Sequence, residues 1–307
     1  MSELRSELRF DGRVAVVTGA GRGVGRAHAL LLAAKGAHVV VADIGGGLTG
    51  TGESSDPADS VVAEIQDAGG SAVACYASVA EQNSAARVVK TALESFGRID
   101  IVVNNAGIHD PAMFEDLTAQ QFRRMLEVHY LGTVFVTQAA WPHMIAAGYG
   151  RVVNTVSEAT LGGITQLSSY GAAKGAVFGL TRNLATEGLV HGIRVNAIAP
   201  RAFTRLSAAH SDTLSAEMSI PGDVMDQINA SMPPELCAPA AAFLAHESCP
   251  LNGEVLQAGM GGVARIAVVC TKGITSPSIS AEEIAERIGE VMDVSDGHVA
   301  ETAGMTL

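Results

Sequence analysis

Seven short apolar runs alternate with alanine-rich segments, and this alternation constrains the fold more than any other feature of the sequence. Each run is rich in β-branched residues and nearly all apolar, which is typical of strands that are covered on both faces. Strands that alternate with helical segments predict a parallel sheet with right-handed crossovers. We therefore expect a Rossmann-type, doubly wound α/β fold. The expected strands are residues 14–19, 38–43, 72–77, 99–107, 151–157, 193–200 and 254–259.

The length and composition agree with this fold class. A chain of 307 residues is long enough for one large α/β domain or two small ones. Aromatic residues make up 4% of the chain, so Ala, Val, Leu and Ile must build most of the core. We expect one domain over residues 1–270 and a C-terminal extension over residues 271–307. Ser280 followed by Glu283 has the pattern of a capping box, which predicts a short helix in the extension.

The charge and hydropathy of the chain argue against several classes of partner. The formal net charge of -12 is unfavourable for nucleic-acid binding, which depends on basic surfaces. No apolar run reaches the ~18 residues that a membrane-spanning helix needs. The first residues, "MSELRSELRFDGR", contain no apolar signal core, and the last, "GMTL", do not match a peroxisomal signal. We therefore expect a cytoplasmic protein that binds neither nucleic acid nor a membrane.

The four cysteines show neither a CxxC pair nor the spacing of metal ligands. In a cytoplasmic protein such cysteines are reduced and serve as small apolar core residues. We therefore expect no metal site, and we expect Cys75, Cys237, Cys249 and Cys270 to be buried.

Two segments interrupt the alternation of strands and helices. Residues 44–57 are rich in Gly and Ser, which predicts a flexible loop. Residues 201–234 contain three prolines and lack a strong period, and we interpret them as a mobile lid over a site. Between these segments, Thr118 with Gln121 forms a second capping-box pattern. That pattern predicts the start of a long helix, which contains His129.

A glycine-rich turn, "TGAGRGVG" at residues 18–25, joins the first expected strand to a helix. Such a turn lets the backbone approach a pyrophosphate, and the helix N-terminus adds N–H donors. Asp43 ends the next strand, 18 residues after Gly25. A carboxylate there can bind both ribose hydroxyls of NAD and repel the extra phosphate of NADP, although Arg22 favours NADP. We predict an NAD site that includes Gly19, Gly21, Arg22, Gly23, Val24, Gly25 and Asp43.

A second motif, "SSYGAAKGA", places Tyr170 and Lys174 four residues apart, so that both face the same side of a helix. Ser157 ends the fifth expected strand. The ordinary phenol pKa near 10 is too high for a base at neutral pH, but a nearby ammonium and a nicotinamide cation lower it. Tyr170 then takes a proton from a substrate hydroxyl as hydride leaves its carbon, while Ser157 holds the oxygen.

Taken together, the glycine turn, "NNAG" at residues 104–107, Ser157, Tyr170, Lys174 and "VNAIAP" at residues 195–200 resemble the short-chain dehydrogenase/reductases over about residues 10–265. The resemblance implies a seven-stranded parallel sheet, a homodimer or homotetramer, and hydride transfer without a metal. It also implies further cofactor contacts. These are Ser78 and Val79 at the adenine, Asn104, Asn105, Ala106 and Gly107 on the adenosine side, Tyr170 and Lys174, and Pro200, Ala202 and Thr204 near the carboxamide.

Several segments, among them "VVADIGG" and "HESCPLNG", resemble more closely the (3R)-hydroxyacyl-CoA dehydrogenase unit of peroxisomal type 2 multifunctional enzymes and their actinobacterial relatives. In this branch a histidine stands where the wider family has a catalytic asparagine, and His129 occupies that position. We interpret His129 as a proton relay to Lys174, as a packed residue bonded to a backbone carbonyl, or as a loss of activity. Arg201 and Phe203 depart from the branch at the lip of the pocket.

The resemblance implies an NAD-dependent enzyme that oxidises a (3R)-hydroxyacyl-CoA, from fatty-acid or sterol side-chain breakdown, to the 3-ketoacyl-CoA. An alternative substrate is a free steroid or another small secondary alcohol, since the same residues serve both. A third hypothesis is a non-catalytic NAD sensor, which the intact Ser157, Tyr170 and Lys174 disfavour.

Overall fold

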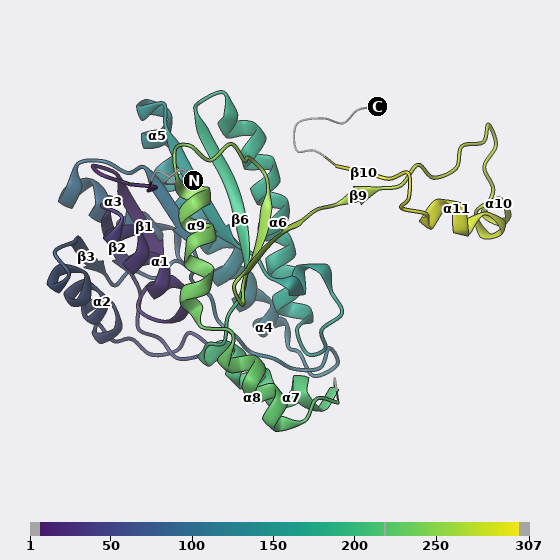
Figure 1. Ribbon diagram of the computed structural model, residues 1–307, viewed down its shortest axis with the longest axis horizontal. Helices are drawn as coiled ribbons and strands as arrows, with labels where there is room; N and C mark the ends of the chain where they lie inside the picture. The colour runs from purple at the N-terminus through teal and green to yellow at the C-terminus, as the bar shows by residue number, and fades with distance from the viewer. Residues whose placement is uncertain (1–6, 218, 301–307) are drawn as a thin grey trace, which may run out of the picture.

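One eight-stranded sheet runs through the body of the protein in the computed structural model, which describes residues 7–217 and 219–300 (Figure 1). The strand order is β3-β2-β1-β4-β5-β6-β7-β8. The first seven strands pair in parallel and coincide with the seven apolar runs, which confirms the predicted fold class. They are β1 (Val14–Thr18), β2 (His38–Ala42), β3 (Ser71–Cys75), β4 (Ile101–Asn104), β5 (Gly150–Thr155), β6 (Ile193–Arg201) and β7 (Val255–Gly259).

The eighth strand, β8 (Gly262–Ile266), is an addition to the seven that we expected. It pairs antiparallel with β7 through a two-residue turn, in which Met260 and Gly261 have φ angles of 53° and 76°. Two positive φ angles define the hairpin turn that matches the natural twist of strands. The side chains of β8 are mostly exposed, so the strand has no buried apolar run by which the pattern would reveal it.

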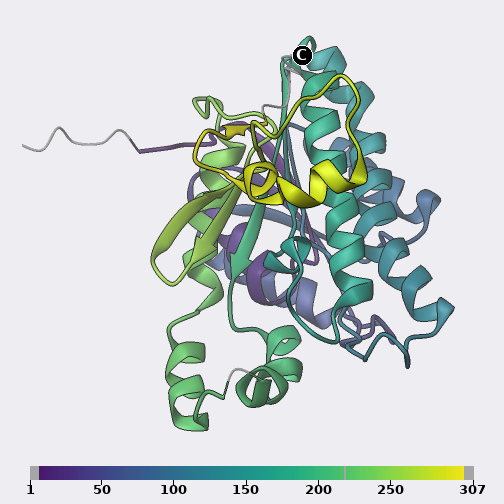
Figure 2. The same ribbon diagram turned by 90° about the vertical axis from the view of Figure 1, so that its right-hand side faces the viewer.

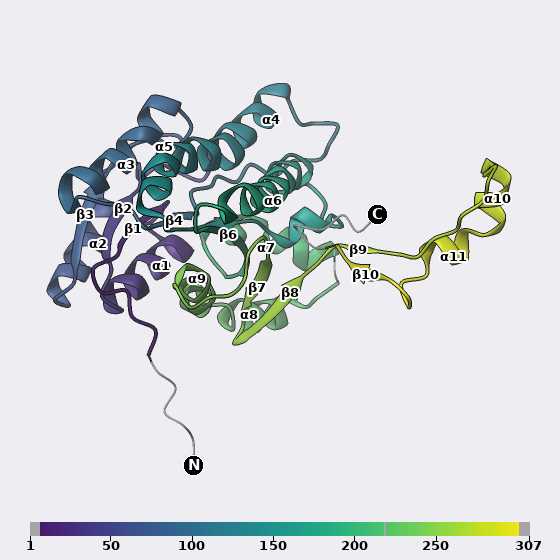
Figure 3. The same cartoon turned by 90° about the horizontal axis from the view of Figure 1, so that it is seen from above.

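Helices cover both faces of the sheet (Figure 3). α1, α2 and α9 pack on one face, and α3, α5 and α6 pack on the other. Each layer encloses a buried cluster made almost entirely of Ala, Val, Leu and Ile, as the low aromatic content requires. The bounds of these helices are α1 (Gly23–Ala34), α2 (Asp56–Asp67), α3 (Gln82–Phe96), α5 (Gly132–Ala147), α6 (Ser168–Leu189) and α9 (Ala238–Ala245).

The helix that carries His129 contains an irregular turn. It begins at α4 (Ala119–Met125), where Thr118 and Gln121 form the predicted reciprocal capping box. Residues Leu126–Leu131 then form a π-helix, and α5 continues directly from it. π-helical turns within α-helices are frequent at functional sites, and His129, which lies in this one, is buried.

The segment 201–234 is more regular than its sequence suggests. It contains α7 (Arg205–Glu217) and α8 (Gly222–Ala230), which project beyond the end of the sheet where β6 leads into them (Figure 2). The short helices η2 (Glu158–Leu161) and η3 (Pro234–Cys237) flank the same end. The mobility of this lid stays a prediction.

Beyond β8 the chain forms an arm that extends away from the sheet (Figures 1 and 3). β9 (Val269–Cys270) pairs with β10 (His298–Val299), and α10 (Ala281–Glu286) and α11 (Ile288–Met292) lie between them. The Ser280 hydroxyl accepts a hydrogen bond from Glu283 N at 3.1 Å, which confirms the predicted cap. Residues 301–307, with the terminal "GMTL", lie outside the described residues.

The arm corrects one expectation about the cysteines. Cys75, Cys237 and Cys249 are buried as predicted, but Cys270 is exposed because β9 leaves the body of the protein. The division between residues 1–270 and 271–307 stays a prediction. Among the helices described, none has the length and apolar character needed to cross a bilayer.

Candidate active site

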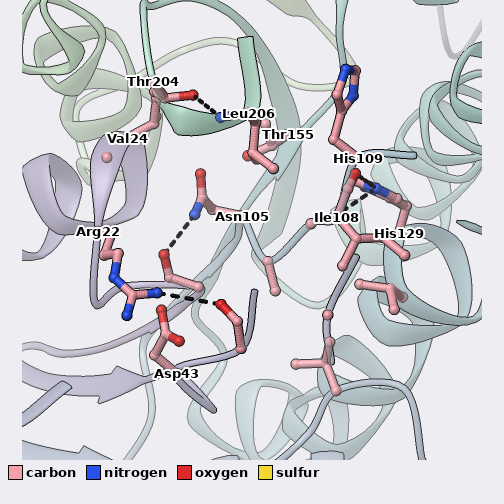
Figure 4. A pocket seen from close by; sticks show the side chains of 18 of the residues that line it. Arg22, Val24, Asp43, Asn105, Ile108, His109, His129, Thr155, Thr204 and Leu206 are labelled. Atoms are coloured by element: carbon pink, nitrogen blue, oxygen red, sulfur yellow. Dashed lines mark hydrogen bonds between the residues drawn. The ribbon is translucent and has the colours of Figure 1, made fainter. Parts of the chain in front are cut away.

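A cavity of about 770 Å³ lies at the carboxyl ends of the central parallel strands. Open α/β sheets bind ligands at this end, beside the point where the strand order reverses. Arg22 and Asp43 lie at one end of the cavity, and His109 and His129 lie at the other (Figure 4). Most of the predicted site residues line it: Gly19, Arg22, Gly23, Val24, Asp43, Ser78, Val79, Asn105, Ala106, Gly107, His129, Ser157, Tyr170, Lys174, Pro200, Ala202 and Thr204.

Three predicted cofactor residues, Gly21, Gly25 and Asn104, lie behind the wall of the cavity instead. A Cβ on Gly25 would stand 2.1 Å from the Gly19 carbonyl oxygen, so this glycine lets α1 pack against β1. The Asn104 side chain is buried and donates to Thr137 and Asn154, at 2.9 Å each. Its role in the structure is to hold β4 to its neighbours rather than to face a ligand.

The glycine turn is fixed from the neighbouring strand by Asn105, which follows β4. Its amide donates to the carbonyls of Thr18 and Gly19 at 3.0 and 3.1 Å. Gly19 has a φ of 63°, a conformation that favours glycine. The N-terminus of α1 opens at Gly23 onto the cavity, so that its free N–H groups and positive dipole end suit a phosphate. The cradle therefore fits the pyrophosphate of a dinucleotide.

Asp43 ends β2 at the position that the sequence predicts for a ribose ligand. Its two carboxylate oxygens accept hydrogen bonds from Gly21 N at 2.8 Å and Gly45 N at 2.7 Å. These bonds hold the carboxylate in place, and each oxygen keeps a lone pair for a sugar hydroxyl.

Two arginines converge beside Asp43. The guanidinium groups of Arg22 and Arg205 both donate to the Gly46 carbonyl, at 3.3 and 3.0 Å. Burial and the charge of Arg22 lower the pKa of Arg205, whereas Asp43 opposes that shift. The sequence points to Arg22 but gives Arg205 no role, because Arg205 reaches the site from α7, across the cavity. Two cations at this place attract the phosphates of a dinucleotide.

The glycine-rich loop at residues 44–57 is hydrogen-bonded across the cavity. Thr49 O accepts a hydrogen bond from Arg124 Nε at 2.7 Å, and Leu48 O accepts one from His109 N at 2.9 Å. With the bonds to Gly46, these contacts tie the loop to the far wall of the cavity. These contacts are ones that composition cannot show, and the flexibility of the loop stays a prediction.

Ser157, Tyr170 and Lys174 meet at the inner end of the cavity. Ser157 follows β5, and its side chain hydrogen-bonds with that of Tyr170. Tyr170 and Lys174 lie on the first turns of α6, with the Lys174 Nζ atom 5.7 Å from the Tyr170 ring centroid. That ammonium donates to the Thr155 carbonyl at 2.7 Å. The arrangement brings together the three residues that the motif predicts.

The electrostatics of these groups differ in one respect from our expectation. Burial raises the pKa of Tyr170, and the hydrogen bond with Ser157 opposes this shift. Burial also lowers the pKa of Lys174 to about 7. Lys174 donates to the Thr155 carbonyl rather than to the phenol, and the net effect of these surroundings raises the pKa of Tyr170. The phenol therefore needs a further positive charge beside it to act as a base.

His129 is buried against the reacting end of the cavity, with its ring edge-to-face on Tyr170 at 5.2 Å between centroids. Its Nε2 atom lies 2.9 Å from Ile108 O and 3.1 Å from Ile108 N. A Cβ on Gly107 would approach the His129 ring to 2.6 Å, so the last glycine of "NNAG" makes room for it. Burial, and secondarily Lys174, lowers the pKa of His129 well below its ordinary value. The ring is therefore neutral near physiological pH.

A second histidine, His109, lies beside Tyr170, and the sequence analysis missed it. Its ring is 8% exposed, lines the cavity and meets the Tyr170 ring edge-to-face at 5.9 Å. The only signal in the sequence is its place two residues after "NNAG", which a motif search does not weigh. Of the two residues that alter the lip, Phe203 lines the cavity, whereas Arg201 forms an ion pair with Glu158 at 2.6 Å.

The fold and this site together define a dinucleotide-binding oxidoreductase. Residues 13–213 match the model of the short chain dehydrogenase family, so the chain belongs to that family and is an enzyme. It is 42% identical to a short-chain type dehydrogenase/reductase of Mycobacterium tuberculosis, over 94% of this chain and 96% of the relative. It is 43% identical to the mouse peroxisomal multifunctional enzyme type 2 over 86% of this chain, and covers 34% of that enzyme's length.

A solved structure extends the likeness to a bound cofactor. The fold is similar to that of a 7α-hydroxysteroid dehydrogenase complexed with NADH and 7-oxo glycochenodeoxycholic acid, with a TM-score of 0.70 and 31% identity. The similarity covers 83% of this chain and 95% of that one. Family and neighbour together indicate a nicotinamide cofactor for this enzyme, and the glycine cradle described above fits one.

Proposed function

We propose that the protein oxidises a (3R)-3-hydroxyacyl-CoA to the 3-ketoacyl-CoA with NAD, in fatty-acid or sterol side-chain breakdown. The observation that carries the proposal is that Asp43, Ser157, Tyr170 and Lys174 line a single cavity. The likeness to the multifunctional enzyme supports the substrate class. Since the chain spans only about a third of that enzyme, the class remains our proposal for this chain.

The residues divide the work of the reaction. Tyr170 removes the proton of the substrate hydroxyl, and Ser157, already bonded to Tyr170, holds the same oxygen. When bound, nicotinamide accepts the hydride, and its positive charge favours the phenolate that burial disfavours. Lys174, fixed by Thr155 O, passes the proton onward, and we propose that a neutral His129 relays it. The reverse reaction uses the same groups with Tyr170 as the acid.

We propose NAD rather than NADP because the Asp43 carboxylate is held where the 2′-oxygen of the ribose lies. Asp43→Asn tests this, since the amide removes the repulsion of a 2′-phosphate while Arg22 and Arg205 remain. We expect kcat/KM with NAD to fall about tenfold and the ratio of NADP to NAD activity to rise by at least that factor. An unchanged ratio would contradict the role of Asp43.

The second candidate function is oxidation or reduction of a free steroid or similar secondary alcohol. The structural likeness to a hydroxysteroid dehydrogenase favours it. The reacting groups would be the same, so only the shape and polarity of the substrate end distinguish the two candidates.

We also propose that the enzyme works as a homodimer or homotetramer in the cytoplasm and binds neither nucleic acid nor membranes. The arm supports the oligomer, because Ile279, Ile284, Ile288, Met292 and Val294 are exposed on it. Apolar side chains gathered on an extended segment are typical of a surface that a further chain covers.

The proposed function is tested by measuring NADH formation from a panel of (3R)-3-hydroxyacyl-CoA esters and free hydroxysteroids. We expect turnover of the esters and its loss in Tyr170→Phe. Turnover of the steroids alone would favour the second candidate, and binding of NAD without turnover of either would favour a sensor.

A further inference from the structure

The short turn that follows Ser157 is held from two sides. It is the 3₁₀ helix η2, whose hydrogen-bond geometry is poorer than that of an α-helix, so its position depends on outside contacts. On one side α6 packs so closely that a Cβ on Gly171 would stand 2.7 Å from the Ala159 carbonyl oxygen. On the other side the carboxylate of Glu158, the first residue of η2, bonds side chains from β6 and β7. η2 is therefore fixed between α6 and the sheet.

Three donors converge on one oxygen of Glu158. The Nε and Nη2 atoms of Arg201 donate to Glu158 Oε1 at 3.1 and 2.6 Å, and Gln257 Nε2 donates to the same oxygen. The side chains of Glu158 and Arg201 are 39% and 43% exposed, and an ion pair this exposed adds little to the stability of a fold. None of the three residues lines the cavity, so they do not contact a substrate directly. What the cluster does is to hold η2 in place.

The position of η2 decides how the Ser157 hydroxyl is used. Ala159 N, the amide that follows Glu158, donates to Ser157 Oγ at 3.2 Å. The bond occupies a lone pair of the hydroxyl oxygen and leaves its one hydrogen for another partner. That partner is Tyr170, because the hydrogen bond with Ser157 opposes the effect of burial on the Tyr170 pKa, as a bond donated to the phenol oxygen does. Ala159 N, Ser157 and the phenol oxygen thus form a chain of donors that points into the cavity.

Building on the proposed function, we propose that Glu158 is a positioning residue that, anchored by Arg201 and Gln257, keeps the Ala159 N–H on Ser157 so that the Ser157 hydroxyl donates to the reacting oxygen. Arg201, which departs from the related branch at the lip of the pocket, supplies the cation of the anchor. Both candidate substrate classes bring a hydroxyl to Ser157 and Tyr170, so the inference holds for either.

The pH profile of kcat tests this role, measured with the ester or steroid that the enzyme oxidises fastest. Without the donated bond from Ser157 the pKa of Tyr170 rises, so the base forms only at higher pH. Glu158→Ala should therefore lower kcat about three- to tenfold near neutral pH and move its rising limb to higher pH by roughly 0.5–1. The variant leaves in place the other titratable groups that face the phenol: Lys174 on α6, His129 on the π-helical turn and His109 after β4.

The direction of this movement separates positioning from a direct effect of charge. A negative charge near a phenol raises its pKa, so the loss of that charge alone would move the limb of Glu158→Ala to lower pH. Glu158→Gln keeps an acceptor for Arg201 and Gln257 and should restore most of kcat. Gln257→Leu removes one bond without changing any charge, and it should move the limb to higher pH by a smaller amount.

Glu64→Ala is the matched control, because Glu64 is 46% exposed, pairs with Arg26 at 2.6 Å and does not line the cavity. The control should leave the profile of kcat in place, and the dissociation constant of NADH should change less than about twofold in every variant. A limb that stays in place or moves to lower pH in Glu158→Ala would overturn the inference, as would an equal movement in Glu64→Ala.

The same measurements distinguish a failure of this inference from a failure of the proposed function. If the unaltered enzyme oxidises none of the hydroxyacyl-CoA esters but turns over a steroid, the proposed substrate class is refuted while the role of Glu158 is still decided by the profile. If Tyr170→Phe keeps full activity, Tyr170 is not the base, and the proposed mechanism and this inference are refuted together.

Discussion

The two ends of the cavity are built in different ways (Figure 4). At the cofactor end, backbone groups do most of the work: the glycine turn, the N-terminus of α1 and the Gly46 carbonyl. At the reacting end, side chains from β4, the π-helical turn, β5 and α6 meet around Tyr170. The first end is encoded by one short stretch of sequence, whereas the second depends on long-range packing.

This difference has an energetic consequence. The glycine cradle itself consists of backbone groups that do not titrate, so its contact with the pyrophosphate should depend mainly on close packing. The reacting end holds Tyr170, Lys174 and His129 where burial shifts the pKa of each away from the charged form. Changes at the two ends should therefore separate binding from catalysis.

We expect Tyr170→Phe to separate catalysis from cofactor binding most clearly. Loss of the hydroxyl removes the general base, so kcat should fall about 10³-fold. The backbone cradle is untouched, and the dissociation constant of NADH, measured by fluorescence, should change less than about threefold. A comparable loss in NADH affinity would show that the two ends are not separable.

A buried histidine, His28 on α1, lies beneath the cofactor end. It is 1% exposed, its ring nitrogens have no hydrogen-bond partner among the described residues, and burial lowers its pKa to about 4. Between the ordinary value of about 6.5 and 4, the unfolded chain binds more protons than the folded one. The free energy of unfolding should therefore fall by about 3 kcal/mol as the pH drops through this window.

Urea unfolding at a series of pH values tests this contribution, with His28→Leu as the comparison. The acid-induced loss should be smaller in the variant by about that amount, because an apolar side chain has nothing to protonate. Parallel curves for the two proteins would mean that other groups cause the whole acid dependence.

The importance of close packing at the cofactor end is tested with a pair of glycines. In Gly25→Ala the added methyl meets the Gly19 carbonyl, so the turn must shift, at about 1–3 kcal/mol or roughly 5- to 150-fold in the dissociation constant of NADH. Gly179→Ala is the control, since that helical glycine has open space around it. The control should keep its affinity and gain about 0.5–1 kcal/mol in stability. Equal affinities in both variants would contradict the packing role.

The same contrast explains what the sequence could predict. The seven parallel strands and the glycine turn follow from local patterns, as do the two capping boxes at Thr118 and Ser280. Tyr170 and Lys174 were found because one helical turn separates them. Each of these features lies within a few consecutive residues, so elementary periodicity and turn chemistry suffice.

The features that were missed or misjudged depend on contacts between distant segments. Arg205 and the loop at residues 44–57 make hydrogen bonds that cross the cavity. Asn104 has the right motif, but its amide donates to Thr137 on α5 and to Asn154 on β5. The strand β8 is exposed and short, so its pairing with β7 is set by a turn and not by an apolar run.

His129 offers the finest test of the difference between the two ends. Its pKa lies well below the ordinary value, so the ring is neutral throughout the working range and can pass a proton only by exchanging one N–H for another. If His129 relays protons, the variant His129→Asn should keep kcat within about twofold, whereas His129→Ala should lower kcat about tenfold. Neither variant should add or remove an inflection near neutral pH in the profile of kcat.

The Ala variant also releases Ile108, so a fall in kcat must be separated from a movement of the wall. Gly107→Ala provides the separation, because it displaces the ring through a contact of 2.6 Å while leaving the imidazole in the chain. If the relay is real, Gly107→Ala and His129→Ala should both lower kcat, and His129→Asn should not. If His129 only anchors Ile108, KM for the substrate should rise in the variants that lose the anchor while kcat stays constant. Unchanged kcat in His129→Ala at every pH would remove the relay and leave the backbone contact as the whole role of the residue.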